Sequence, residues 1–225
     1  MLKKEELIKR FNINIKALEQ EQEKLAKLVI EKDKINFENL HFIGGVDATT
    51  AAKEIIGSAA IINPDFEVIE QKYSTKKASF PYLSGFLAYR ELPALISAYK
   101  KLETKPDVVF VSGHGVLHPR YCGLASHFGL ATDSITIGVA KDLLVGEVKK
   151  DKVYLNGKVK GMLVETKKAS KPIVVSVGHN ISLATAVELT KKFSREPHKF
   201  PEPLTQAHKY ANSIKNELRR KVKLI

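Results

Sequence analysis

Cysteine is almost absent from the sequence, which holds a single one, Cys122, in 225 residues. One thiol cannot form an intrachain disulfide framework, and so low a content is typical of proteins of the reducing cytosol. No stretch of about eighteen consecutive apolar residues occurs, which argues against a transmembrane helix. The N-terminal residues 1–10 alternate charges and lack the apolar core of a signal peptide. We therefore expect a cytoplasmic protein that does not enter a membrane.

Internal repeats, disordered tracts and linkers rich in Gly, Ser or Pro are also missing. The composition, 44% hydrophobic and 28% charged, suits a soluble globular protein with a substantial core. At this length one large domain is expected, and we assign it to residues 1–225.

Acidic residues are in the minority: 25 Asp and Glu stand against 37 Lys and Arg, for a net charge of +12. A basic surface favours polyanions, such as nucleic acid or an anionic membrane. Lysine-rich surfaces also occur in heat-adapted proteins that have no such partner. The charge by itself leaves both interpretations open.

Apolar periodicity in the first third of the chain predicts one or two helices over residues 3–33. Three strand-like segments follow, at 41–50, 56–64 and 66–77. Because short links join these segments, they are expected to form an antiparallel meander.

Helices and strands alternate in the rest of the chain. The Asn156-Gly157 pair is a strong signal for a hairpin turn and predicts a hairpin over 153–165. Ser182 is a suitable N-cap for the helix that follows it. This order of elements predicts an α/β domain around one mixed sheet. The expected helices are 80–102, with a break at Pro93, 123–131, 182–193 and 201–223, and the expected strands are 108–111, 134–141 and 171–182.

Three polar residues, Asp47, Glu91 and Ser112, stand where apolar elements end. Carboxylates from separate elements can hold Mg²⁺ through their oxygen atoms. Two such ions, about 3.5–4 Å apart, would stabilise the attacking water and the leaving oxygen of a phosphodiester. Alternatively, Asp47 caps a turn and Glu91 pairs with Arg90 or a nearby lysine.

The stretch from His114 to His127 invites two further interpretations. His114, His118, Cys122 and His127 are all zinc-ligand types. However, Pro119 and two glycines interrupt any helix that would align them. A Cys122–His127 nucleophile pair would lack an orienting third group. Buried histidines with satisfied hydrogen bonds are the ordinary alternative to both.

Six segments carry a resemblance to a known family. "GVDATT", "PYLSGFLAYRE", "GHGVLHPRYCGLASHFGL", "TIGVAK", "GHNISLATA" and "PEPLTQAHKYAN" resemble endonuclease V in order and approximate spacing, from about residue 42 to 212. The resemblance implies a ribonuclease H-like mixed sheet, in which an antiparallel meander is followed by βα units and helices flank the sheet. It also implies a Mg²⁺-dependent cut, with Mn²⁺ as a substitute, at the second phosphodiester 3′ of deoxyinosine. The expected partner is inosine-containing DNA, with RNA as a further candidate, and the expected state is a monomer.

The resemblance also implies roles for individual residues. Asp47 and Glu91 match the acidic metal ligands, His208 matches an active-site position near the metal, and Lys141 matches a lysine that would stabilise charge on the phosphate or water. "PYLS" (81–84) matches a wedge that enters the duplex beside an extruded base. The residues expected to contact the substrate are Pro81, Tyr82, Leu83, Gly85, Arg90, Gly113, His114, Gly115, His118, Gly123, Leu124 and His127.

The chain departs from this pattern at Ser112, where the resemblance predicts an aspartate. Serine is neutral at pH 7 and a poor Mg²⁺ ligand, so this metal-ligand position is vacant. Asp107, at the other end of the strand, is about 16–17 Å away if the chain is extended, and the position of Asp133 cannot be read. Two functions are therefore expected in competition: a nuclease, or a catalytically weak or inactive protein that binds inosine-containing nucleic acid.

Overall fold

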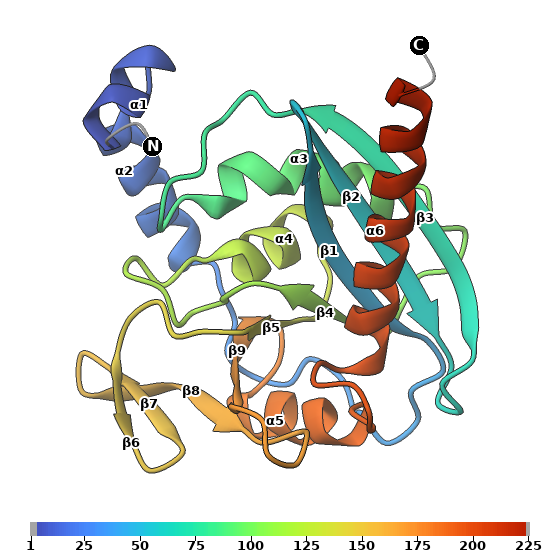
Figure 1. Cartoon of the computed structure of the whole chain (residues 1–225). Coiled ribbons are helices and arrows are strands. Elements are labelled where there is room, and N and C mark those ends of the chain that lie inside the picture. The colour runs from blue at the N-terminus through green and yellow to red at the C-terminus, as the bar shows by residue number, and fades with distance from the viewer. Residues whose placement is uncertain (1–3, 224–225) are drawn as a thin grey trace.

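The computed structural model describes residues 4–223 and is built on a nine-stranded mixed sheet (Figure 1). The spatial order of the strands is β3-β2-β1-β4-β5-β9-β8-β7-β6. β1 pairs with β4 and β4 with β5 in parallel, whereas the other neighbours are antiparallel. The strands are β1 (Ile43–Ala51), β2 (Glu54–Ile62), β3 (Val68–Lys77), β4 (Val108–Ser112), β5 (Thr136–Ala140), β6 (Glu147–Lys149), β7 (Lys152–Leu155), β8 (Lys158–Val164) and β9 (Ile173–His179).

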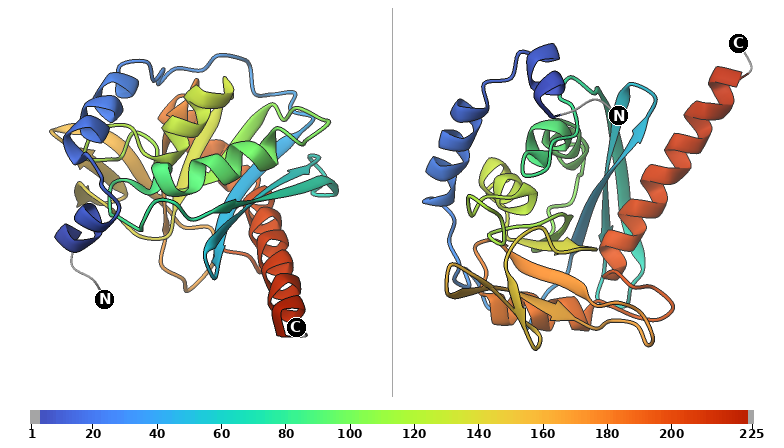
Figure 2. Two further views of the ribbon diagram at one scale, coloured as in Figure 1. Left: turned by 90° about the horizontal axis from the view of Figure 1, so that it is seen from above. Right: turned by 60° about the vertical axis from the view of Figure 1, so that its left-hand side comes forward.

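Helices cover both faces of the sheet (Figures 1 and 2). On one face, α3 and α4 pack against Val46, Val109 and Val111. On the other face, α5 and the start of α6 pack against a second core that includes Ile43 and Phe110. The helices are α1 (Lys4–Arg10), α2 (Ile15–Ala26), α3 (Leu87–Tyr99), α4 (Leu124–Thr132), α5 (Leu183–Lys192) and α6 (Glu202–Lys223).

Strand alternation decides which side chains face α6. Successive residues of a strand point to opposite faces. Ile43 of β1 and Phe110 of β4 belong to the core beneath α5 and α6. Asp47 and Ser112 follow them by even numbers of residues, so both point to the same side of the sheet as α6.

A glycine lets α6 approach β1 closely. A Cβ on Gly45 would stand 2.2 Å from the backbone of Pro203, so any larger residue would push the helix away. Further along, the buried Ser58 hydroxyl lies 3.1 Å from the carbonyl oxygen of Asp47 and 2.7 Å from that of Ala207. These contacts hold the first turns of α6 beside Asp47. Neither Gly45 nor Ser58 is distinctive in the sequence, because their role exists only where helix and strand cross.

The expected architecture, an antiparallel meander followed by βα units in one mixed sheet, is confirmed. The hairpin turn is confirmed too, with positive φ at both Asn156 (49°) and Gly157 (75°). Ser182 caps α5, accepting a hydrogen bond from the N–H of Thr185. Of the one or two helices expected over residues 3–33, the structure has two, α1 and α2, although residue 3 lies outside the described residues.

The helix expected over 80–102 is wrong at its start and at Pro93. Residues 80–86 are not helical, and α3 begins at Leu87 and continues through Pro93 to Tyr99. Pro93 is on the exposed side of α3. Water can therefore replace the hydrogen bond that its missing N–H would have made. The short strand β6 was not expected.

None of the helices within residues 4–223 is both long and apolar enough to cross a membrane.

Candidate active site

Asp47 and His208 form the best-defined polar pair of the site. Nδ1 of His208 lies 2.7 Å from Oδ2 of Asp47. The Asp47 side chain is buried, with 8% exposed, whereas His208 is 63% exposed. The hydrogen bond to Asp47 raises the pKa of His208, and the negative charge of Asp47 adds to the effect. The sequence placed these residues in one site only through family resemblance, and the crossing of α6 over β1 brings them into contact.

Glu91 is the second carboxylate of the site and comes from α3. Burial, together with the negative charge of Asp47, raises the pKa of Glu91 to about 8 against the opposing effect of Arg90. Its carboxylate accepts no hydrogen bond from any of the described residues. The simple pairing of Glu91 with Arg90 is not formed. Instead, Arg90 donates to the carbonyl oxygen of Phe80 at 2.5 Å.

Ser112 lies beside Asp47 where β4 ends. Val46 and Val111 are paired in the parallel ladder, and Asp47 and Ser112 are the next residue of each strand. Ser112 is in turn paired with Val139 of β5. Lys141 follows β5 directly, and its side chain is exposed.

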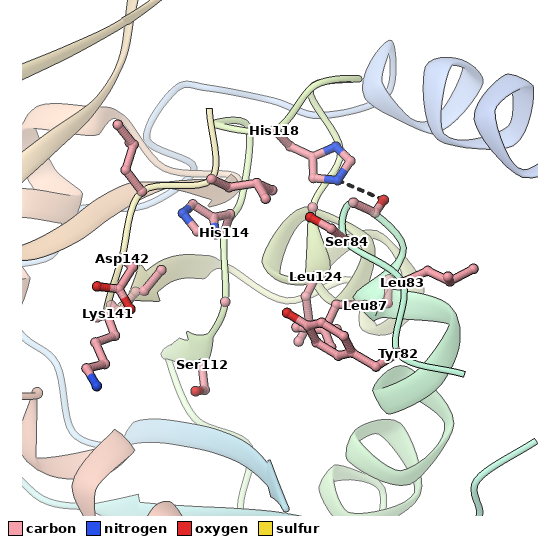
Figure 3. A pocket seen from close by; sticks show the side chains of 18 of the residues that line it. Tyr82, Leu83, Ser84, Leu87, Ser112, His114, His118, Leu124, Lys141 and Asp142 are labelled. Atoms are coloured by element: carbon pink, nitrogen blue, oxygen red, sulfur yellow. Dashed lines mark hydrogen bonds between the residues drawn. The ribbon is translucent and has the colours of Figure 1, made fainter. Parts of the chain in front are cut away.

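Ser112 and Lys141 both line a pocket of about 410 Å³. Figure 3 shows Lys141 and Asp142 on one side, Tyr82 and Leu124 on the other, and Ser112 and His114 between them. The walls also include the loop 141–144 and Phe200. The lining residues are Gln22, Tyr82, Leu83, Ser84, Gly85, Leu87, Ala88, Ser112, Gly113, His114, His118, Gly123, Leu124, Val139, Ala140, Lys141, Asp142, Leu143, Leu144 and Phe200.

Most of the expected substrate-contacting residues therefore surround one pocket, but Pro81, Arg90, Gly115 and His127 do not line it. Gly115 instead donates its N–H to the Ser176 hydroxyl of β9. The ring of His127 packs edge-on against Tyr89, with 5.7 Å between centroids. The expectation that these two residues line the pocket is thus not met, because each is used in packing behind it.

The pocket histidines are neutral at pH 7. Burial lowers the pKa of both His114 and His118 to about 4, and Arg120 contributes for His118. Nδ1 of His118 accepts from the N–H of Arg120, so Nε2 carries the proton that it donates to the carbonyl oxygen of Gly85 at 3.0 Å (Figure 3). These two histidines therefore offer polar but uncharged groups to a ligand.

These two histidines predict a loss of stability in mild acid. Each folded pKa of about 4 lies below the unfolded value of 6.5, so the folded state binds fewer protons. Their contribution is complete above about pH 6.5 and is lost as the pH falls toward about 4, at about 3 kcal/mol per group. Urea unfolding over this pH range should show the decline.

His118→Gln is the matched variant, because its amide can still donate to Gly85 but cannot take up a proton. Its free energy of unfolding should fall less steeply with acidification than that of the wild-type chain. Equal slopes for the two chains would contradict the assignment.

A divalent cation fits the two carboxylates. Glu91 is largely buried without a hydrogen-bond donor, and Oδ1 of Asp47 likewise has no partner within residues 4–223. Oxygen atoms of this kind are preferred by Mg²⁺ and Mn²⁺. A cation would also relieve the repulsion that raises the pKa of Glu91. Only two carboxylates are available as ligands for this cation, because Ser112 is neutral.

A zinc site at His114, His118, Cys122 and His127 is not formed. Across the described part of the chain, no three His, Cys, Asp or Glu side chains are gathered in a way that could hold a metal ion. Cys122 is fully buried, and burial raises the pKa of its thiol to about 12, which also argues against a nucleophile pair.

Asp107 and Asp133, the two aspartates considered as replacements for a ligand at Ser112, both make other interactions. Oδ2 of Asp107 accepts hydrogen bonds from the N–H groups of His41 and Phe42, at 2.8 and 2.9 Å. Asp133 forms the C-cap of α4, and its exposed carboxylate pairs with Lys34. Neither Asp107 nor Asp133 therefore fills the vacancy at Ser112.

Comparison with known proteins agrees with this geometry. The family model of endonuclease V matches residues 23–209 of the chain. The chain belongs to the endonuclease V family. Endonuclease V of Dictyoglomus turgidum is 39% identical over 204 residues, which cover 87% of this chain and 88% of that one. Like its relatives, this endonuclease V is a nuclease.

Solved structures of endonuclease V have the same fold. Human endonuclease V superposes with a TM-score of 0.82 at 30% identity, covering 92% of this chain and 100% of that one. Endonuclease V of Ciona intestinalis, solved in complex with DNA containing an inosine followed by a ribo-adenosine, gives a TM-score of 0.81 at 26% identity. That comparison covers 91% of this chain and 98% of the Ciona chain.

Proposed function

We propose that this endonuclease V is a metal-dependent nuclease that cuts DNA at the second phosphodiester 3′ of deoxyinosine. The observation that carries the proposal is the shared position of Ser112, which lies beside Asp47 in the ladder and also lines the pocket. A base held in the pocket would thus keep its own strand close to the two carboxylates. The Ciona relative bound to inosine-containing DNA supports the same substrate class.

The pocket is suited to an extruded base. Its volume of about 410 Å³ is typical of small-ligand sites. Nε2 of His114 is buried and has no hydrogen-bond partner among the described residues, so it is available to a polar edge of the base. Glycines at positions 113 and 123 leave backbone groups accessible along the wall. Adenine and hypoxanthine differ at such an edge, which allows discrimination by hydrogen bonding.

The carboxylates and their neighbours supply the chemistry of the cut. Asp47 and Glu91 would hold Mg²⁺, or Mn²⁺ in its place, and the bound ion would supply charge stabilisation for the phosphate and an acidified water. His208 orients Asp47 through the 2.7 Å hydrogen bond. The exposed amine of Lys141, at the mouth of the pocket, is placed to neutralise charge on the phosphate.

Tyr82 is the proposed wedge, because this residue lines the pocket and is 69% exposed. Tyr82→Ala is expected to weaken binding of an inosine duplex about tenfold, because loss of an aromatic stacking partner costs about 1–3 kcal/mol. The loss should be smaller for a single strand, which has no partner bases to separate. Fluorescence anisotropy titrations of both substrates test this, and equal losses would contradict a wedge role.

Strand cleavage of a labelled duplex tests the proposal as a whole. The duplex carries one deoxyinosine, and a matched duplex carries adenine at that position. With Mg²⁺ or Mn²⁺, incision one nucleotide beyond inosine is expected, and chelation by EDTA should stop it. Cutting of both duplexes at equal rates, or at another position, would overturn the substrate assignment.

A second function rests on the neutral side chain of Ser112. Without a third carboxylate, the chain could bind inosine-containing nucleic acid and cut it weakly or not at all. Binding of the inosine duplex without incision in either metal would support this alternative. Inosine-containing RNA should be tested in parallel.

For the setting of this function, we propose a monomer of one domain over residues 1–225 that acts in the cytoplasm. The single buried cysteine suits a reducing compartment. Residues 1–3 and 224–225 of that proposed domain lie outside the described part.

A further inference from the structure

The wedge segment ends in a carbonyl group held by three side chains. The carbonyl oxygen of Gly85 lies 3.2 Å from Nε2 of Gln22, 3.0 Å from Nε2 of His118 and 2.9 Å from Nη2 of Arg120. Gly85 has a φ of +78°, a conformation that favours glycine. Three donors from two other segments of the chain therefore fix one point of the loop that carries Tyr82.

Gln22 is the central member of this cluster. It belongs to α2, and only 1% of its surface is exposed. Its amide nitrogen also lies 3.3 Å from the carbonyl oxygen of Cys122, and its Oε1 accepts from Nε of Arg120 at 2.6 Å. A buried amide that uses both its nitrogen and its oxygen in this way has a determined orientation.

Arg120 is held in place in its turn. Its guanidinium lies over the ring of Phe86, 4.4 Å from the centroid, and its Nη1 pairs with Glu19 of α2 at 3.4 Å. Tyr89, near the start of α3, donates a hydrogen bond from its hydroxyl to the carbonyl oxygen of Leu18 in α2. Helix α2 is thus attached by polar contacts to Gly85 itself and, through Tyr89, to the start of α3.

We propose that Gln22 is a positioning residue that sets the place of the wedge loop, residues 81–85, relative to the base pocket. This inference rests on the proposed function. Gln22 lines the pocket, but its polar atoms are engaged by Gly85, Cys122 and Arg120, so it does not read the base itself. Its effect on recognition passes through Gly85 to the loop that carries Tyr82.

The chain contains no tryptophan, so Tyr82→Trp introduces a single indole, which can be excited apart from the tyrosines, into the wedge loop. In that background, Gln22→Glu removes the donors to Gly85 and Cys122 but keeps the shape and the acceptor for Arg120. We expect time-resolved anisotropy of the indole, without substrate, to show faster and wider nanosecond motion after this change. Gln20→Glu makes the same change at an exposed position of α2 whose side chain has no hydrogen bond to any of the described residues, so it is the matched control and should leave the motion unchanged.

The second readout is recognition by the chain that keeps Tyr82. Gln22→Glu should lower the ratio of affinities for inosine and adenine duplexes about tenfold, through the loss of about two hydrogen bonds. Thermal unfolding confirms that the variant is folded. If it is not, Arg120→Lys, which removes the Nη2 bond to Gly85 while keeping the charge, takes its place.

The outcomes separate this proposal from the proposed function. A wild-type chain that fails to distinguish inosine from adenine would overturn the function, and the anisotropy would still decide whether Gln22 holds the loop. A wild-type chain that discriminates, together with a Gln22→Glu variant that changes neither readout, would overturn the positioning role. A fall in discrimination without a change in loop motion would overturn it as well.

Discussion

Ser112→Asp is expected to increase Mg²⁺-dependent cleavage of an inosine duplex by on the order of 100-fold. The new carboxylate would stand beside Asp47 at the end of β4, where the ladder places Ser112. A third anionic ligand should strengthen metal binding and hold the reacting water in a defined place, which is worth several kcal/mol in charge stabilisation. Single-turnover cleavage at several Mg²⁺ concentrations measures both the rate and the apparent metal affinity.

Ser112→Asn is the control for this experiment, because asparagine has the size of aspartate without its charge. It should not increase cleavage. If Ser112→Asp changes neither metal affinity nor rate, the position does not belong to the metal site. If the wild-type chain only binds and the aspartate variant cuts, a single neutral residue accounts for the binding-only function.

Asp47→Asn is expected to reduce cleavage by about 1,000-fold or more, since removal of one residue of a catalytic unit has effects of this size. Asp47 is at once a proposed metal ligand and the partner of His208, so the change weakens both. Binding of the inosine duplex measured without metal should change little, because Asp47 does not line the pocket. Gel-based cleavage and anisotropy titrations of the same preparation separate the two effects.

Asp133→Asn is the matched control, because Asp133 is an exposed aspartate at the C-cap of α4 and belongs to neither the proposed metal site nor the pocket. It has a positive φ of 49°, a conformation that asparagine adopts readily, so the backbone should be undisturbed. Cleavage should remain at the wild-type level. Residual cleavage by Asp47→Asn within a few fold of wild type would show that Glu91 and the rest of the site work without it.

Local signals in the sequence were sufficient for much of the fold. The Asn156-Gly157 turn and the Ser182 cap depend on neighbouring residues, and the structure confirms both. The error at 80–86 has a tertiary cause. This apolar segment resembles the start of a helix, but its backbone is held instead by groups distant in the sequence, such as Gln22 and Arg120 on the carbonyl oxygen of Gly85. Gln22 gave no signal, because an isolated glutamine in a charged helix is unremarkable.

The family, most of the order of the elements and the absence of an aspartate at residue 112 could be read from the sequence, whereas the short strand β6 could not. These properties depend on residue identity and on spacing along the chain. The tertiary structure alone decided that His208 contacts Asp47, that Gly115 and His127 lie behind the pocket, and that α2 holds the wedge loop. Such contacts join residues as much as 161 positions apart. They depend on how helices cross the sheet, and spacing along the chain does not specify that crossing.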